Sequence, residues 1–412
     1  MKVYFNLKRN FYALPILCVL GSMLFHSCSK DAPIKEDATL KKEVQTKSKK
    51  LRVSGVGTAP IDLGATQITK NLYKNLNEVA WNTKDILFGQ EFYNSYSFGG
   101  GNHNDKTFSD FKDITGDHPA VLGQDFMYYI YKTSTERAIH KAAALHAYTN
   151  GAVVTFDFHM PSKYHAGPNY SSSDLNLMYN IGNNNDAYGE VTWFKAELDK
   201  TISIINELNI PITFRLLHEM NGNWFWWGTQ ANGGSASYQK MFQLAVNHIK
   251  SKTDLALFAW SPNYPFNSGT YPGTNYYPGD LYVDVVGLDM YDINTSAGQS
   301  FSVMVTELTA VSDFGWSHNK IPVFSEVGNR VNSPDSYPYW WYNLNEALQG
   351  SNRAFKLAWM LTWINQGWDG PAYAPYVAYW NSSTSAKTAL RDFKNMSTTL
   401  MLSDSKTRNM YD

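Results

Sequence analysis

Cysteine is almost absent from this 412-residue sequence, which contains only Cys18 and Cys28. If the chain is cleaved before Cys28, the rest of it carries no other thiol. Disulfide bonds, zinc sites built from cysteine and cysteine nucleophiles are then excluded from the main domain. Charged residues are also sparse, at 17%, whereas aromatic residues reach 15%. The composition therefore predicts a large core, with aromatic side chains left over for a binding cleft.

Long hydrophobic runs are scarce as well. The apolar run Phe11–Leu24 follows a basic start and is too short for a comfortable membrane span. Residues 1–27 resemble a bacterial lipoprotein signal, which implies that Cys28 is acylated and anchors the exported protein to the outer membrane. The face of that membrane stays open. An ordinary signal peptide with an incidental Cys28 is the alternative, because Leu24 lies four rather than three residues before the cysteine.

Aromatic residues are missing from residues 29–60, which carry eight Lys or Arg and four Asp or Glu. This composition is typical of a solvated tether, so we interpret residues 28–60 as flexible. Without residues 1–60 the chain holds 24 basic and 32 acidic residues, a balance of −8. An acidic body argues against nucleic acid as a partner and favours a neutral polysaccharide.

From residue 61 onward, amphipathic helical patterns alternate with short apolar runs. The predicted strands are 85–90, 119–124, 152–159, 210–219, 255–260, 283–289, 321–326 and 357–363. The predicted helices are 65–81, 134–149, 190–208, 236–251, 300–316, 338–349 and 385–399. Eight buried strands alternating with helices predict an α/β fold, a (β/α)8 TIM barrel, formed by one domain at 61–412.

The fourth predicted strand runs into Arg215, His218 and Glu219, and the aromatic block Trp224–Trp227 follows a turn. A carboxylate at the end of a buried strand is costly unless it is paired or functional. We expect the aromatic block to be exposed and to offer stacking platforms for sugar rings. The alternative is that Glu219 pairs with Arg215 as scaffold and that the tryptophans belong to the core.

The seventh predicted strand has the same pattern, an apolar run that ends in Glu326. Glu219 and Glu326 are 107 residues apart, which leaves room for three strand–helix units. Two carboxylates on such strands would face each other across the barrel mouth, as glycoside hydrolysis requires. His103, His118, His159 and His165 do not fall at metal-ligand spacing on one element, so we predict no metal and no cofactor. Weak calcium binding by the Asn- and Asp-rich loop 180–186 is the alternative.

The segment from Arg215 to Gly228 resembles the acid/base motif of glycoside hydrolase family 26, and Phe324–Gly328 resembles that family's nucleophile motif. The resemblance implies that Glu219 is the general acid/base and Glu326 the nucleophile of a retaining enzyme. It further implies that other residues bind substrate or hold the nucleophile, namely His159, Arg215, His218, Trp224, Tyr291 and Trp363.

The resulting expectation is a monomeric, retaining endo-β-1,4-mannanase that cuts β-mannan, galactomannan or glucomannan. Glu219 would need a raised pKa, which we attribute to partial burial and to Glu326 as a neighbouring anion. Alternatives within the family are a mannobiose-releasing exo-enzyme, a mixed-linkage glucanase and a β-1,3-xylanase. The long loop 160–189 would close the cleft in the exo-enzyme. A non-catalytic surface glycan-binding protein is the alternative of another class.

Overall fold

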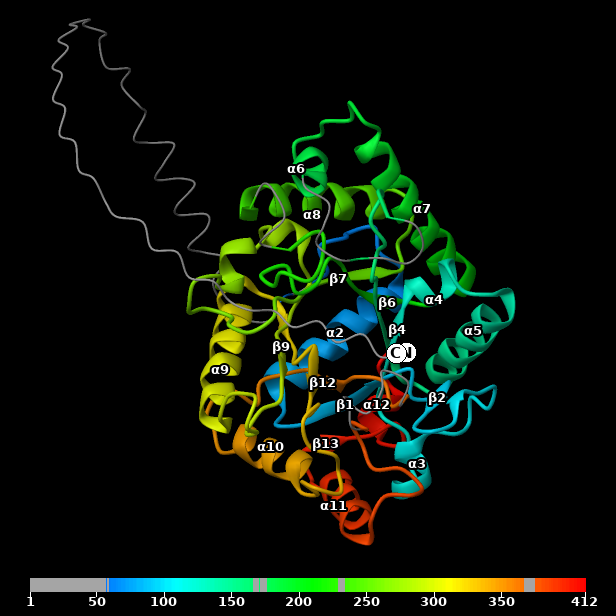
Figure 1. The fold of residues 1–412 in the computed structure, drawn as a ribbon, viewed down its shortest axis with the longest axis vertical. Helices are drawn as coiled ribbons and strands as arrows, with labels where there is room; N and C mark the ends of the chain where they lie inside the picture. Colours follow the sequence, from blue (N-terminus) through cyan, green and yellow to red (C-terminus); the bar gives the residue numbers. More distant parts are fainter. Residues whose placement is uncertain (1–56, 58, 166–169, 171–175, 229–233, 367–374) are drawn as a thin grey trace, which may run out of the picture. The chain divides into compact units, whose positions relative to one another are not determined.

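The computed structural model describes residues 57, 59–165, 170, 176–228, 234–366 and 375–412 (Figure 1). Eight parallel strands in this part of the chain form a barrel. They are β1 (Ile86–Glu91), β4 (Val121–Asp125), β5 (Val153–Asp157), β6 (Ile212–Arg215), β7 (Ala256–Trp260), β8 (Val285–Val286), β10 (Ile321–Pro322) and β12 (Trp359–Thr362). The predicted (β/α)8 barrel is confirmed.

The strand order is β10-β8-β7-β6-β5-β4-β1-β12, and main-chain hydrogen bonds join its two ends. Ala358 N donates to Pro322 O at 2.8 Å and Phe324 N donates to Trp359 O at 2.9 Å. These bonds close the sheet on itself and leave no free edge, which an open sheet would expose to other chains. The short strand β13 (Thr399–Leu400) is added beside β1 at the amino end.

Helices surround the barrel (Figure 1). They are α3 (Asp110–Thr115), α4 (Phe126–Ile130), α5 (Ser134–Thr149), α6 (Leu177–Gly182), α7 (Glu190–Leu208), α8 (Gly234–Lys250), α9 (Phe301–His318), α10 (Trp340–Gln349) and α11 (Thr384–Lys394). The short helix α12 (Ser405–Arg408) lies nearer the middle of the view. Helix α2 (Gln67–Asn82) covers the amino end of the barrel, where Leu72 and Leu76 pack with the inward-facing Leu87 and Val121. The barrel is therefore open to a ligand at its carboxyl end.

The interior of the barrel changes character along the strands. On β5, Val153 belongs to the apolar cluster under α2, whereas Val154 and Phe156 face the outer helices. Because side chains alternate along a strand, Val153, Asp157 and the residue between them, Thr155, point inward. These inward positions pass from apolar through polar to charged, so the charge is concentrated at the carboxyl end of the barrel.

Most predicted elements agree with the structure to within a few residues, but two predicted strands are each split in two. Segment 283–289 forms β8 and then β9 (Asp289–Tyr291), and segment 321–326 forms β10 and then β11 (Glu326–Gly328). The hairpin of β2 (Tyr96–Ser97) and β3 (Gly101–Asn102) was not predicted, nor were the short helices α3, α4, α6 and α12. Elements of a few residues carry too little hydrophobic periodicity to be read from sequence.

The predicted signal 1–27 and most of the predicted tether 28–60 lie outside the described residues. The lipid anchor at Cys28 and the export to the outer membrane therefore stay predictions. In the part of the chain that the structure describes, no helix is both long and apolar enough to cross a membrane.

Candidate active site

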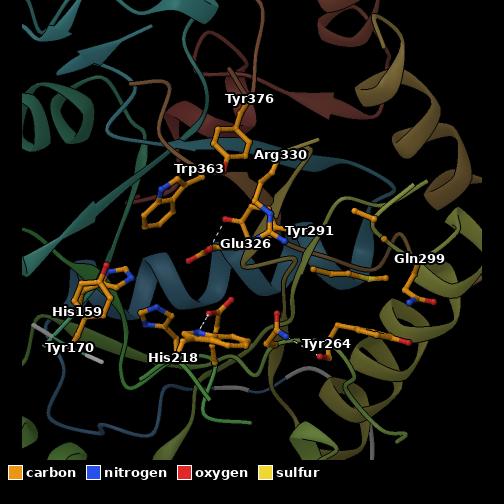
Figure 2. Close-up of a pocket in the computed structure, with 16 residues that line it drawn as sticks. His159, Tyr170, His218, Tyr264, Tyr291, Gln299, Glu326, Arg330, Trp363 and Tyr376 are labelled. Atoms are coloured by element: carbon orange, nitrogen blue, oxygen red, sulfur yellow. Dashed lines mark hydrogen bonds between the residues drawn. The ribbon is translucent and has the colours of Figure 1, made fainter. Parts of the chain in front are cut away.

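A cavity of about 730 Å³ opens at the carboxyl end of the barrel (Figure 2). Seven of the eight side chains predicted for the site line it, namely His159, His218, Glu219, Trp224, Tyr291, Glu326 and Trp363. The eighth, Arg215, is buried among the carboxylates beneath it. The structure thus brings together residues that come from five different strand ends.

Glu219 owes its position to an unusual turn after β6. Leu217 and Glu219 both have positive φ angles, 48° and 53°, which non-glycine residues rarely adopt. Such conformations cost about 1–3 kcal/mol each and cluster at functional sites. The Glu219 amide donates to Ser261 O at 2.8 Å, and Trp224 Nε1 donates to Glu219 Oε2 at 2.6 Å. The turn therefore holds the Glu219 carboxyl at the cavity wall.

Glu326 is placed by a β-bulge between β10 and β11. The amides of Ser325 and Glu326 both donate to Leu288 O, at 3.0 and 3.5 Å. Two residues of this segment therefore lie opposite the single residue Leu288 of the neighbouring segment. A bulge turns the following side chain away from the strand's alternation. The Glu326 carboxylate then meets Arg215 Nη2 through one oxygen, and its other oxygen accepts a bond from the Tyr291 hydroxyl at 2.6 Å.

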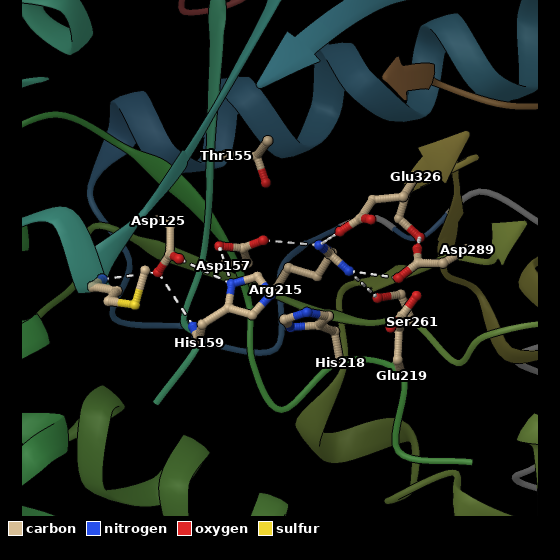
Figure 3. A network of polar contacts seen from close by, with 12 residues as sticks. Asp125, Thr155, Asp157, His159, Arg215, His218, Glu219, Ser261, Asp289 and Glu326 are labelled. Atoms are coloured by element: carbon tan, nitrogen blue, oxygen red, sulfur yellow. Dashed lines mark hydrogen bonds and ion pairs between the residues drawn. The ribbon is translucent and has the colours of Figure 1, made fainter. Parts of the chain in front are cut away.

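Arg215 lies at the centre of a buried ionic network (Figure 3). Its Nη1 donates to Asp289 Oδ2 at 2.7 Å and its Nη2 donates to Asp157 Oδ2 at 2.9 Å, in addition to the contact with Glu326. The side chain is 5% exposed. The alternative in which Arg215 pairs with Glu219 as scaffold is wrong, because the guanidinium binds three other carboxylates.

The two candidate catalytic carboxyl groups lie close together. One oxygen each from Glu219, Asp289 and Glu326 can be found within 4.8 Å of one another. Retaining glycosidases have carboxyl groups about 5–5.5 Å apart, and inverting ones about 6.5–9.5 Å. The close approach of these oxygens is compatible with the shorter separation of a retaining enzyme.

Two sets of side chains come close enough to hold a metal ion, although neither set lies on one element. They are Glu219, Asp289 and Glu326, and Asp157, His159 and His218. Spatial clustering across strands is invisible to a search for ligand spacing along the sequence. Arg215 already supplies positive charge to Asp157, Asp289 and Glu326. In both sets, therefore, carboxylates already have the Arg215 guanidinium as their counter-ion.

The pKa of Glu219 is raised to about 7. Burial is the largest cause and the Asp289 carboxylate is the next, while Arg215 and the Trp224 hydrogen bond act in the opposite direction. The expected direction is correct, but the neighbouring anion that raises this pKa is Asp289 rather than Glu326. Burial likewise raises the pKa of Asp157 and of Asp289 to about 6. Glu219 is thus poised to give and take a proton near neutral pH.

Two histidines complete one wall of the cavity, and their charges differ. Burial, with the charges of Arg215 and His159, lowers the pKa of His218 well below its usual value, so this ring stays neutral. Burial also opposes charge on His159, but the carboxylates of Asp125 and Asp157 prevail and raise its pKa. His159 Nδ1 lies 2.9 Å from Asp125 Oδ2. The wall therefore offers one neutral and one more basic imidazole.

The aromatic block Trp224–Trp227 is mostly core, contrary to the prediction of exposure. Trp224 is 40% exposed and lines the cavity, whereas Phe225 is 4% and the two following tryptophans 0% exposed. Trp226 Nε1 donates to Met160 O at 2.9 Å and Trp227 Nε1 to His218 O at 2.7 Å. These bonds satisfy the indole groups inside the protein, so the block supports the Glu219 turn and presents a single platform.

Sequence reasoning missed several residues of the site. They are Asp125, Asp157 and Asp289 in the ionic network, and Tyr170, Gln299, Arg330 and Tyr376 around the cavity. The three aspartates close strand runs just as Glu219 and Glu326 do, and that signal was available. Residues 166–169 and 171–175 of the loop 160–189 lie outside the described residues, so the closure of the cleft that the exo-enzyme alternative requires is not tested.

A (β/α)8 barrel with two close carboxyl groups over an aromatic-lined cavity at its mouth is the architecture of glycoside hydrolases. The sequence model of Glycosyl hydrolase family 26 matches residues 61–363. The chain therefore belongs to glycosyl hydrolase family 26, as its motifs suggested.

Relatives and solved structures agree with this assignment. The chain is 28% identical to a mannan endo-1,4-β-mannosidase of Bifidobacterium adolescentis over 81% of its own length, and 28% identical to mannan endo-1,4-β-mannosidase A and B of Caldalkalibacillus mannanilyticus over 76%. It spans only 34% and 61% of the length of these two relatives. The catalytic domain of a Bacillus sp. JAMB-750 family 26 endo-β-1,4-mannanase is similar with a TM-score of 0.76, at 26% identity, over 87% of this chain and 97% of that one.

Proposed function

We propose that this protein is a retaining endo-β-1,4-mannanase. The observation that carries the proposal is the pair Glu219 and Glu326, whose oxygens approach within 4.8 Å at the mouth of the barrel. The substrate class is supported by the relatives, which are mannan endo-1,4-β-mannosidases. A neutral polysaccharide also suits the excess of acidic residues in the domain.

In the proposed mechanism each acid takes one role. Glu326, held between Arg215 and the Tyr291 hydroxyl, attacks the anomeric carbon, and a covalent glycosyl–enzyme ester forms. Glu219, whose pKa of about 7 keeps a large fraction of it protonated near neutral pH, gives its proton to the departing glycosidic oxygen. It then removes a proton from the water that hydrolyses the ester. Two inversions at one carbon give net retention.

The stereochemistry and the cutting mode are tested together on linear β-1,4-mannan. NMR of the first products is expected to show the β-anomer before mutarotation, with a spread of oligosaccharides and a rapid fall in viscosity. Products of α-configuration would contradict the two-step mechanism. Mannobiose as the sole product, at unchanged viscosity, would favour the exo-enzyme. Faster cleavage of mixed-linkage glucan or β-1,3-xylan would change the substrate class. Binding of mannan without cleavage would favour a glycan-binding protein.

The pH profile tests the role of Glu219. Because its pKa is about 7, kcat/KM of the wild type should fall as the pH rises through that value and the acid loses its proton. The Trp224 hydrogen bond stabilises the carboxylate, so Trp224→Phe should raise the pKa and move this limb to higher pH. Trp363→Phe is the control, since it alters another aromatic wall of the cavity. A limb that moves to lower pH in Trp224→Phe would contradict the assignment.

A further inference from the structure

Arg330 lies on the cavity wall two residues after β11, and it is held unusually firmly for a side chain that is 44% exposed. Its main-chain amide donates to Asp292 Oδ1 at 2.6 Å. Its Nε and Nη2 both donate to Asp292 Oδ2, at 2.9 and 2.7 Å. Two hydrogen bonds from the guanidinium to Oδ2 restrain the side chain, and the bond from the main-chain amide to Oδ1 ties the backbone to the same carboxylate.

The fixed guanidinium covers the ring of Tyr291. The Arg330 Cζ atom is 4.8 Å from the ring centroid, within the range of a cation–π interaction. The hydroxyl at the far end of this ring donates to Glu326 Oε2 at 2.6 Å. Figure 2 shows the three side chains in succession along one wall, with Tyr376 beside them. A chain of contacts therefore leads from Asp292 through Arg330 and Tyr291 to the candidate nucleophile.

We propose that Arg330 is a positioning residue for the hydrolytic reaction, which acts on Glu326 through Tyr291. A positive charge over the ring face draws electron density from the phenol, and the hydroxyl becomes a stronger donor to an anionic acceptor. Stacking also fixes the ring, so that the hydrogen bond is in place before the substrate arrives. The inference rests on the proposed role of Glu326 as a nucleophile that must be ionised.

Several other charges face Glu326 and set the background for this effect. Arg215 contacts it directly, and Glu219 and Asp289 have oxygens within 4.8 Å. Asp157 is connected through Arg215. Arg215 favours the ionised form of Glu326, whereas the three acids oppose it whenever they are charged. The contribution of Arg330 adds to that of Arg215 from the opposite end of the carboxylate, through the second oxygen.

A different role is open to Arg330, because its Nη1 makes no hydrogen bond to the described residues and the side chain borders the cavity. It could donate to a sugar hydroxyl and contribute to binding alone. The two roles differ in their kinetic signature. A group that only binds sugar raises KM when it is removed, whereas a group that acts on the nucleophile lowers kcat and changes the pH profile.

The experiment compares Arg330→Met and Arg330→Lys with the wild type on linear β-1,4-mannan oligosaccharides. For Arg330→Met we expect kcat to fall roughly 3- to 30-fold, in line with the range of cation–π energies, and KM to change less than about twofold. The acid limb of kcat/KM, where Glu326 must lose its proton, should move to higher pH. Arg330→Lys keeps the positive charge and should recover part of the loss.

Arg353→Met is a matched control, because Arg353 also stacks on aromatic rings, those of Trp81 and Trp316, and pairs with an aspartate, but it does not border the cavity. It should match the wild type in kcat and pH profile. The inference is overturned if Arg330→Met raises KM at unchanged kcat, if its acid limb stays in place, or if Arg330→Lys is as impaired as Arg330→Met. A wild-type protein that cleaves no β-glycan would instead refute the proposed function.

Discussion

Glu326→Ala is expected to lower the turnover of β-1,4-mannan by several orders of magnitude while the barrel stays folded. The variant lacks the carboxylate that we propose as the nucleophile, so the proposed covalent route is closed. Folding should change little, because Arg215 keeps Asp157 and Asp289 as partners and one of three mutually repelling carboxylates is gone. Initial rates of reducing-sugar release and a thermal unfolding curve measure the two effects.

Azide separates the roles of the two acids on an aryl β-mannoside with a good leaving group. In Glu326→Ala the anion can enter the vacated space and attack directly, which gives an α-azide. In Glu219→Ala the ester still forms, because a good leaving group needs no proton, and azide opens it to give a β-azide. Glu78→Ala, on the exposed side of α2, is the control and should behave as the wild type. A β-azide from Glu326→Ala would exchange the two assignments.

The barrel was predictable because its strands are short apolar runs bounded by turns and separated by amphipathic helices. What the pattern could not show is where a run breaks. Apolar residues continue across the bulge before Glu326, and the break becomes visible only when two amides share the carbonyl of Leu288 on the neighbouring strand. A bulge is a property of a strand pair, so one strand's sequence does not determine it.

The two candidate catalytic carboxylates could be predicted from the sequence, but the residues that contact them were harder to predict. Glu219 and Glu326 stand out because a carboxylate at the end of a buried strand is costly unless it is paired or functional. Asp157 and Asp289 carry the same signal, yet only the register that aligns Asp157 with Arg215 shows which charges meet. The aromatic block Trp224–Trp227 was wrongly predicted to be exposed, because the indole groups of Trp226 and Trp227 donate to main-chain carbonyls inside the fold, at Met160 O and His218 O. Residue type alone does not reveal such acceptors.

Arg215→Met should be the most destabilising of the substitutions considered, at about 3–5 kcal/mol near neutral pH, because it leaves three buried carboxylates without their counter-ion. Methionine keeps the length of the aliphatic stem and removes the guanidinium, so the loss combines the missing charge with the space that the guanidinium filled. Activity should fall as well, since Glu326 loses a partner that favours its ionised form. Lys141→Met, which breaks an exposed pair with Glu207, is the control and should cost about 0–1 kcal/mol.

The pH dependence of this loss has a definite sign. Asp157 and Asp289 have pKa values of about 6 in the folded protein, above the ordinary carboxyl value, because burial outweighs the charge of Arg215. Without Arg215 both values rise further, so the folded variant binds more protons than the unfolded chain and loses stability as the pH increases. Urea unfolding should therefore show a smaller deficit at pH 5, where these acids are protonated, than at pH 8. A deficit that grows on acidification, or one below about 1 kcal/mol at pH 8, would mean that Arg215 does not hold the network together by its charge.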